Sequence, residues 1–256
     1  MAVGNDVPAA IVGRRVAVPL FAIGRAGGYA DHVVAGEGDI FSLPDALSFE
    51  DAAALQVQGL TALHMVRQSA PSGRTILVTA AAGGVGSLLV QLARDSGASR
   101  IIVAAGADEK RRLALSLGTD VAVDYSRPGW GEIVREATGG RGVDIAYDLV
   151  GGALTKDCLG ALAPGGELIF GALGRVSLGS ADLEEIFARN QSIRGFALLP
   201  LLSAEGLKTD LAWLFDKAAT GRLTVLQGGR YALDRVADAH RAVESRATIG
   251  KVVLAP

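Results

Sequence analysis

The pattern of apolar and polar positions divides the chain into a long central part and two shorter ends. From Arg74 onward, continuous runs of valine, isoleucine, leucine and alanine alternate with segments in which apolar residues recur every three or four positions. Such runs are typical of strands buried on both faces, and helical spacing indicates the helices that cover them. The predicted strands are 75–79, 100–104, 121–124, 143–148 and 167–171, and the predicted helices are 86–96, 108–117, 130–138 and 152–162.

This alternation of strands and helices with short connections predicts a doubly wound α/β fold, with a parallel Rossmann sheet and right-handed crossovers. A further helix near 181–189, a strand near 192–198 and a long helix at 204–219 continue the pattern. Gly221 stands where a glycine would end that last helix.

The two ends of the chain have a different texture. Short β-like pieces separated by glycine and proline occupy 15–20, 27–35 and 40–44, and the stretch 231–256 holds an amphipathic helix followed by the strand KVVLA. This texture predicts a small, mainly antiparallel unit. Because the α/β core stands between the ends, we expect them to form one discontinuous second domain. The expected segments are 1–57 and 222–256 for the β-rich domain, and 58–221 for the dinucleotide-binding domain.

A cluster of glycines lies between the first central strand and the helix that follows it, in TILVTAAAGGVGSLLV (75–90). A dinucleotide fingerprint needs a tight turn after a strand, close backbone approach to a pyrophosphate, and close packing of helix on strand. Ala81 takes the place of its first glycine, and Gly83 and Gly86 take the other two, with Gly84 beside them. A glycine-rich turn without a ligand is the alternative, but the flanking strand and helix favour dinucleotide binding.

The end of the second central strand bears on which dinucleotide is bound. NAD sites usually carry an acid there, which binds the ribose 2′-hydroxyl. Here the strand ends in the small, uncharged residues 104–106, and the acids Asp108 and Glu109 fall on the next helix. This leaves room for a 2′-phosphate, and Lys110 is within reach of one. Although Lys110 could equally be a solvated helix residue beside two arginines, the pattern favours NADP(H).

Charge and cysteine content narrow the class of protein. The chain has 25 basic and 27 acidic residues, a formal net charge of −2, so nothing indicates electrostatic binding to nucleic acid or to a membrane. One cysteine and three scattered histidines make a zinc site implausible, and we expect no metal. Arg14 and Arg15 interrupt any signal-peptide core, which together with the lone cysteine predicts a reducing cytoplasm.

Several segments resemble the zinc-free quinone oxidoreductase branch of the medium-chain dehydrogenase/reductase family. The central ones are TAAAGGVG, GADEKRRLALSLGTDVAVDY, GRGVDIAYDLVGG and LAPGGELIFGALG; others are VGRRVAV, GGYADHVV, LPDALSFEDAAAL, QGLTALHM and the terminal GKVVLAP. They occur in the family's order and span nearly the whole chain. The resemblance implies an NADPH-dependent reductase that transfers hydride to a quinone or an activated alkene, and a GroES-like fold for the β-rich domain.

Carried over position by position, the resemblance also implies a set of cofactor-binding residues. The glycine turn would hold the pyrophosphate, the Lys110 region would meet the adenosine 2′-phosphate end, and a third group would lie near or cover the nicotinamide. In that order the groups are Ala82, Gly83, Gly84, Val85 and Gly86; Gly106, Lys110 and Tyr125; and Thr61, Val150, Gly171 and Phe196. Each residue of the last two groups has an alternative role in packing or capping.

The resemblance fails at the start of the chain. Members of the branch carry roughly sixty further residues before the point that matches Val3, a sizeable part of a domain. In addition, Arg14 stands where they usually have an acid. We therefore expect an incomplete GroES-like domain with exposed apolar surface and a wide, open cleft beside the nicotinamide. A partner subunit could supply the missing wall, the chain could be truncated, or it could have lost redox catalysis.

Two functions therefore remain open. One is the NADPH-dependent quinone or enone reductase, and the other is a cofactor-binding or repurposed protein without reductase activity. Tyr29 and His32 are the nearest polar candidates for catalysis, but hydride transfer to a quinone needs no dedicated base, so no catalytic residue is assigned. The resemblance further implies a homodimer in which the strand-like segment 192–199 pairs with its copy. The sequence leaves the physiological substrate open.

Overall fold

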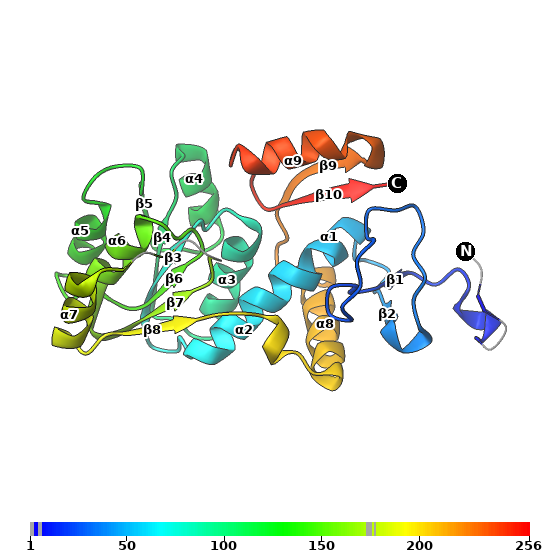
Figure 1. The fold of residues 1–256 in the computed structure, drawn as a ribbon, viewed down its shortest axis with the longest axis horizontal. Coiled ribbons are helices and arrows are strands. Elements are labelled where there is room, and N and C mark those ends of the chain that lie inside the picture. Colours follow the sequence, from blue (N-terminus) through cyan, green and yellow to red (C-terminus); the bar gives the residue numbers. More distant parts are fainter. Residues whose placement is uncertain (1–2, 5–6, 173–175, 177) are drawn as a thin grey trace. The chain divides into compact units, whose positions relative to one another are not determined.

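The computed structural model describes residues 3–4, 7–172, 176 and 178–256, and the chain divides into two compact units. One unit runs from Thr61 to Leu198, and the other combines Met1–Leu60 with Leu199–Pro256 (Figure 1). The helix at 204–219 belongs to the discontinuous unit, whereas the expected boundary at 221 placed it in the dinucleotide-binding domain. It packs there because Leu214 lies against Gly59, where an added Cβ would come within 3.2 Å of its Cδ1.

The central unit is built on a six-stranded parallel sheet with the order β5-β4-β3-β6-β7-β8. Its strands are β3 (Thr75–Thr79), β4 (Arg100–Ala104), β5 (Val121–Val123), β6 (Val143–Asp148), β7 (Leu162–Phe170) and β8 (Ser192–Gly195). Successive strands move outward from β3 in one direction and then from β6 in the other. The order of the strands therefore reverses between β3 and β6, and in sheets of this kind ligands bind outside the carboxyl ends of the strands at that point.

Helices cover both faces of this sheet, as the doubly wound prediction requires. They are α2 (Leu60–Ser69), α3 (Gly84–Asp95), α4 (Asp108–Ser116), α5 (Trp130–Glu136), α6 (Leu154–Ala161) and α7 (Ser180–Ala188). Trp130 and Val134 of α5 and Cys158 of α6 are buried in one core cluster with side chains of the sheet. The hydroxyl of Ser69 at the end of α2 meets that of Tyr147 on β6, and burial raises the pKa of Tyr147 to about 12.

The discontinuous unit contains two small sheets. An antiparallel pair, β1 (Val16–Ala17) and β2 (Phe41–Ser42), forms one, and a parallel pair, β9 (Gln227–Ala232) and β10 (Lys251–Ala255), forms the other. Its helices are α1 (Phe49–Ala54), a π-helical turn η3 (Leu55–Gly59), α8 (Ala204–Ala219) and α9 (Val236–Glu244), with single turns η1 (Ala9–Ile11), η2 (Glu37–Asp39), η4 (Leu199–Leu201) and η5 (Leu233–Arg235). The guanidinium of Arg15 donates to the carbonyls of Pro44 and Asp45, at 2.8 and 2.7 Å, and orders the approach to α1.

The structure confirms the predicted α/β Rossmann class. It corrects two predictions for the unit formed by the two ends of the chain. The β-like segment 27–35 forms bends and extended chain rather than a strand, with Val34 79% exposed. The unit is also not mainly antiparallel, because α9 is a crossover that brings β10 parallel to β9. The stretch 49–69, for which the sequence analysis predicts no helix, is helical throughout: α1 and α2 are joined by the π-helical turn η3.

Candidate functional site

The glycine turn lies between β3 and α3, at the carboxyl edge of the sheet where the strand order reverses. After Thr79 the chain turns through Ala80, whose φ of 49° is in the left-handed region, and the N–H of Gly83 returns to the Ala80 carbonyl at 2.8 Å. Gly83 is the N-cap of α3 and offers no side-chain cap. The first bond along the helix runs from the Ser87 N–H to the Gly83 carbonyl, at 3.0 Å. The N–H groups of 84–86 precede that bond and are oriented to receive an anion.

Gly86 brings α3 into close contact with the end of β3. A Cβ added at Gly86 would lie 2.4 Å from the Ala80 carbonyl oxygen and 2.8 Å from the Ala81 Cα, so any larger residue must push the helix away. At Gly83 the corresponding distance to the Ala80 oxygen is 3.2 Å. The turn thus fits the dinucleotide fingerprint: the last glycine sets the helix against the strand, and the turn leaves backbone open toward a phosphate.

A buried hydroxyl without a partner lies in the same turn. Ser87 is 1% exposed, and its Oγ has no hydrogen-bond partner among the described residues. Buried hydroxyl groups are nearly always hydrogen-bonded in folded proteins. The Ser87 Oγ is thus an unsatisfied polar atom beside the turn, while the close contact at Gly86 and the open N–H groups of 84–86 fit the first turn of α3 to a dinucleotide pyrophosphate.

The neighbouring strands β4 and β5 place two of the predicted residues in contact. A Cβ added at Gly106, just after β4, would lie 3.1 Å from Cε2 of Tyr125, which follows β5. Lys110 lies on the first turn of α4, on the same edge and half-buried. The small strand end expected from the sequence is therefore lined by the ring of Tyr125.

Arg111, which sequence reasoning did not select, holds this corner together. It is 15% exposed, donates to the Ala105 carbonyl at 3.0 Å, and pairs with Asp108 at 2.6 Å and with Asp124 at 3.2 Å. The hydrogen bonds from Arg111 and Arg112 lower the pKa of Asp108. A hydrogen bond from the Ser126 hydroxyl, followed by smaller contributions that include the charge of Arg111, lowers the pKa of Asp124. Both acids that border the corner are thus paired with arginines.

The loop after β6 is ordered by a second residue that the sequence did not single out, Asp148. Its buried carboxylate accepts the N–H groups of Val150 and Gly151 through Oδ1, at 3.0 and 2.9 Å, and the hydroxyl of Thr155 through Oδ2, at 2.7 Å. The signal that could have found it is an acid that closes an apolar strand directly before Leu149, Val150 and two glycines. A carboxylate in such a place must be enclosed by hydrogen-bond donors.

The remaining predicted residues apart from Thr61 lie on the same edge. The N–H of Gly171, after β7, donates to the Asp148 carbonyl at 3.0 Å, and an added Cβ there would lie 2.4 Å from Cε of Met65. Thr61 lies one turn before Met65 on α2. Phe196 is 9% exposed, and its N–H donates to the Phe170 carbonyl at the end of β7, at 2.9 Å. The twelve predicted residues thus belong to the central unit. Eleven lie in the segments that follow strand ends on the carboxyl edge, which extend into the first turns of α3 and α4, and Thr61 lies on α2.

Of the three histidines, His64 lies on α2, the helix that carries Thr61, whereas His32 and His240 lie in the discontinuous unit with Tyr29. Tyr29 and His240 contact each other within the discontinuous unit, with 3.2 Å between Oη and Nε2. Cys158 is fully buried on α6, and burial, with the nearby Asp148 and Asp157, raises the pKa of its thiol. Within the described part of the chain, no three His, Cys, Asp or Glu residues come together as metal ligands.

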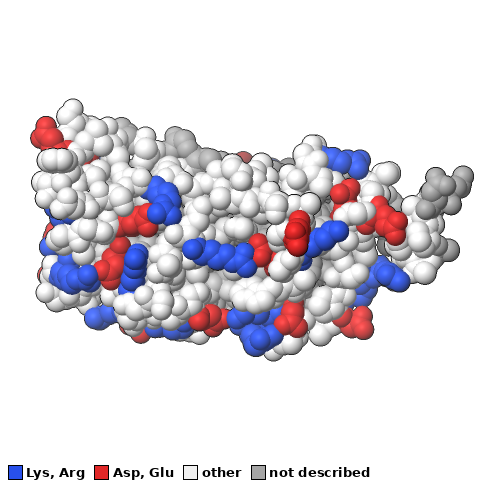
Figure 2. Space-filling model, turned by 90° about the horizontal axis from the view of Figure 1, so that it is seen from below, with Lys and Arg blue, Asp and Glu red and all other residues white. Residues whose placement is uncertain are grey.

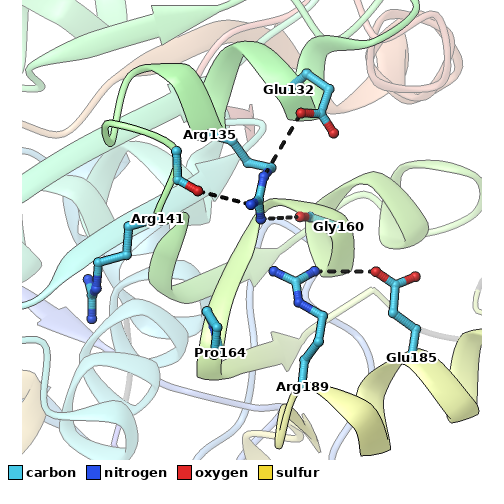
Figure 3. Close-up of a pocket in the computed structure, with 8 residues that line it drawn as sticks. Glu132, Arg135, Arg141, Gly160, Pro164, Glu185 and Arg189 are labelled. Atoms are coloured by element: carbon cyan, nitrogen blue, oxygen red, sulfur yellow. Dashed lines mark hydrogen bonds and ion pairs between the residues drawn. The ribbon is translucent and has the colours of Figure 1, made fainter.

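A pocket of about 760 Å³ opens at the opposite, amino edge of the sheet (Figure 3). Three arginines line it. Two donate to backbone carbonyls at or after helix ends: Arg135 to Gly140 and Gly160, at 2.9 and 3.4 Å, and Arg189 to Leu162 at 2.5 Å. The third, Arg141, pairs with the carboxylate of Asp144 at 2.6 Å. The carboxyl ends of helices carry unpaired carbonyls and partial negative charge, which the guanidinium groups of Arg135 and Arg189 neutralise. Their donors are therefore engaged by the fold rather than presented to an anion.

The discontinuous unit has a cavity of its own, of about 820 Å³, lined largely by valine, leucine and isoleucine side chains of residues 3–43 and by Phe49. On the face shown in Figure 2, basic and acidic side chains are interspersed rather than gathered in one patch. Among the residues that the structure describes, no helix combines the length and apolar character needed to cross a membrane.

Comparison with known proteins places this geometry in a family. A family model described as a zinc-binding dehydrogenase matches residues 84–215. A quinone oxidoreductase of Pseudomonas aeruginosa is 34% identical over 263 aligned positions, which cover 100% of this chain and 78% of that protein. A 2-haloacrylate reductase of a Burkholderia species is 32% identical, with 99% of this chain and 77% of the relative covered.

Solved structures agree. The Escherichia coli quinone oxidoreductase in complex with NADPH superposes with a TM-score of 0.86 at 28% identity, over 99% of this chain and 78% of that one. The chain belongs to the medium-chain dehydrogenase/reductase family, in its quinone oxidoreductase branch.

Proposed function

We propose that the protein is an NADPH-dependent reductase that transfers hydride to a quinone or to an activated alkene such as an enone. The observation that carries the proposal is the carboxyl edge of the central sheet. There the turn closed by Gly86 offers backbone N–H groups to a pyrophosphate, and the strand end beside it lacks the acid that NAD sites use. Relatives named quinone oxidoreductase and 2-haloacrylate reductase support the substrate class.

In this proposal the residues of the edge divide the cofactor among them. The turn of Ala82, Gly83, Gly84, Val85 and Gly86 holds the pyrophosphate, and Gly106, Lys110 and Tyr125 surround the adenosine 2′-phosphate end. Thr61, Val150, Gly171 and Phe196 lie near the nicotinamide. NADPH, when bound, supplies the hydride, while the protein binds, orients and shields it.

The reduction is completed by one proton. Hydride adds two electrons to a quinone or to the β-carbon of an enone, and a proton from water then neutralises the oxyanion or enolate. The proposal therefore needs no dedicated acid or base, and we assign none. It also needs no metal, because the quinone or enone is already electrophilic.

We further propose that the central unit is the dinucleotide-binding domain and that the enzyme acts in the cytoplasm as a homodimer. Support for the dimer comes from β8, an edge strand whose four residues are all exposed, Ile193 among them. On α7, Leu183 and Phe187 are also exposed, at 56% and 86%. An unpaired strand edge beside apolar side chains suits pairing with a second copy. Sedimentation that shows only monomer at micromolar concentration would contradict the dimer.

The test of function begins with fluorescence titration of the purified protein with NADPH and NADH. We expect NADPH to bind more tightly. A panel of quinones and enones is then screened for NADPH oxidation, and we expect turnover of about 1 per second or faster on at least one of them. Absence of binding by either cofactor overturns the whole proposal. Binding without turnover of any compound leaves a cofactor-binding protein and removes the reductase.

A further inference from the structure

The buried carboxylate of Asp148 connects three parts of the carboxyl edge. Asp148 ends β6, and its Oδ1 lies 3.4 Å from the hydroxyl of Thr79, which ends β3. Through Oδ2 it accepts the hydroxyl of Thr155 on α6, at 2.7 Å, and its main-chain carbonyl accepts the Gly171 N–H after β7, at 3.0 Å. Asp148, Thr79 and Thr155 are all fully buried. One residue thus joins β3, β6, α6 and the end of β7 where the strand order reverses.

The same carboxylate fixes the peptide groups of the loop that follows. The N–H groups of Val150 and Gly151 point at Oδ1, from 3.0 and 2.9 Å, and the Leu149 N–H points at the Thr79 Oγ1, from 2.9 Å. In a planar trans peptide the carbonyl points opposite to the N–H. The carbonyls of Leu149 and Val150 therefore point away from the Asp148 carboxylate. The orientation of each of three successive peptide groups is thus fixed by a buried side chain.

We propose that Asp148 is the positioning residue of the nicotinamide end of the site: it acts through the 149–151 loop and not by touching the reactants. The inference rests on the proposed function, which places Val150 and Gly171 near the nicotinamide. Asp148 governs both, Val150 through its carboxylate and Gly171 through its carbonyl. Hydride transfer is sensitive to displacements of about 1 Å, whereas the pyrophosphate and adenosine contacts lie on other strands. Loosening the loop therefore lowers kcat and leaves NADPH affinity nearly intact.

Asp144 provides a matched control on the same strand. It lies at the other end of β6, where it too accepts a backbone N–H, from Thr75 at 2.8 Å, and a side-chain donor, Arg141 at 2.6 Å. Asp148→Ala and Asp144→Ala thus remove the same chemical group from opposite ends of one strand. Both are expected to lower Tm, but only Asp148→Ala is expected to change the loop.

The experiment measures kcat, the Kd for NADPH and the amide hydrogen exchange of 149–152 in the cofactor-free protein. For Asp148→Ala we expect faster exchange in that segment, kcat lower by about tenfold or more, and a Kd within about threefold of wild type. Asp148→Asn should restore kcat to within about threefold, since its amide oxygen still accepts the two N–H groups and its amide nitrogen can donate to Thr155. Asp144→Ala should leave kcat and the exchange of 149–152 unchanged.

Should Asp148→Ala fail to fold, Thr79→Val tests the inference, because valine fills the same volume but takes away the acceptor of the Leu149 N–H. Faster exchange of 149–152 with a lower kcat is expected. Three results would overturn the inference. One is wild-type exchange and kcat in folded Asp148→Ala or Thr79→Val. The others are an equal loss of kcat in Asp148→Ala and Asp148→Asn, and a fall in kcat matched by an equal fall in NADPH-binding capacity. If wild-type protein binds no NADPH, the proposed function fails, while the exchange data still report on the loop.

Discussion

The two edges of the central sheet use opposite chemistry. At the carboxyl edge, α3 begins with glycines, and the Ser87 hydroxyl beside them has no partner among the described residues. At the amino edge, arginines bind the carbonyls at helix ends, as Arg94 does with Gly118 and Ala98, at 2.9 and 3.0 Å. One edge keeps helix amino ends open to an anion, and the other fills helix carboxyl ends with its own cations. The difference teaches that a cluster of arginines in a pocket need not be a ligand site.

The largest expected effect comes from exchanging glycine for alanine at the two edges. Gly86→Ala forces a Cβ to within 2.4 Å of the Ala80 oxygen, whereas Gly160→Ala at the amino edge meets nothing within 4 Å. We expect Gly86→Ala to cost about 2 kcal/mol or more of unfolding free energy and to weaken NADPH binding roughly hundredfold. Gly160→Ala should stabilise the protein by up to about 1 kcal/mol. Urea unfolding measures the stability of the two variants, and fluorescence titration measures their affinity for NADPH. Equal changes in Gly86→Ala and Gly160→Ala would contradict the contrast between the edges.

A smaller effect is expected at the adenosine end of the carboxyl edge. If Lys110 meets the 2′-phosphate, Lys110→Ala should reduce the preference for NADPH over NADH by about tenfold, the scale of one charge-assisted hydrogen bond. The control is Arg112→Ala on the same helix, where the guanidinium is 76% exposed and pairs with Asp108. Fluorescence titration of each variant with NADPH and NADH gives the ratio of the two Kd values, which is compared with that of wild type. A preference unchanged in Lys110→Ala would assign selectivity to other residues.

At the amino edge, Arg135→Ala should affect stability alone. The substitution removes the guanidinium that donates to the carbonyls of Gly140 and Gly160. We expect a loss of about 1–2 kcal/mol of unfolding free energy. The Kd for NADPH should not change, because the proposed cofactor-binding residues do not lie at this edge. A weaker Kd at unchanged stability would contradict the division between the edges.

The smallest effect concerns acid stability, again at the amino edge. Burial acts to raise the pKa of Asp144, but hydrogen bonds from Arg141 and the Thr75 N–H outweigh it, and the pKa lies below its usual value. The stabilisation is therefore present above the unfolded-state pKa of about 3.9 and is lost as the pH falls through the lower folded-state value. Unfolding midpoints in urea between pH 6 and pH 3 should fall less steeply for Asp144→Asn than for wild type. Parallel curves would show that the pair contributes nothing.

Sequence reasoning reached the parts that depend on local pattern. The five central strands and the glycine turn follow from continuous apolar runs and from residues that tolerate close contact, and these are properties of short segments. Asp148 and Arg111 were missed because their roles depend on partners from other elements, such as Thr79 and Asp124. The segment 27–35 has the β-like texture of a strand in the sequence but forms none, because a strand also requires a partner edge.

The division of the chain into one continuous and one discontinuous unit has a consequence for biosynthesis. Residues 61–198 leave the ribosome as one uninterrupted stretch, with most pairings between strands that are near in sequence, so the central unit can fold while translation continues. The segment before residue 61 completes its unit only when 199–256 have been made, and within that later segment β10 pairs with β9. Until then the apolar residues around the cavity of the discontinuous unit lack the rest of their unit to pack against. Nascent chains are most exposed to aggregation and chaperone capture at that stage.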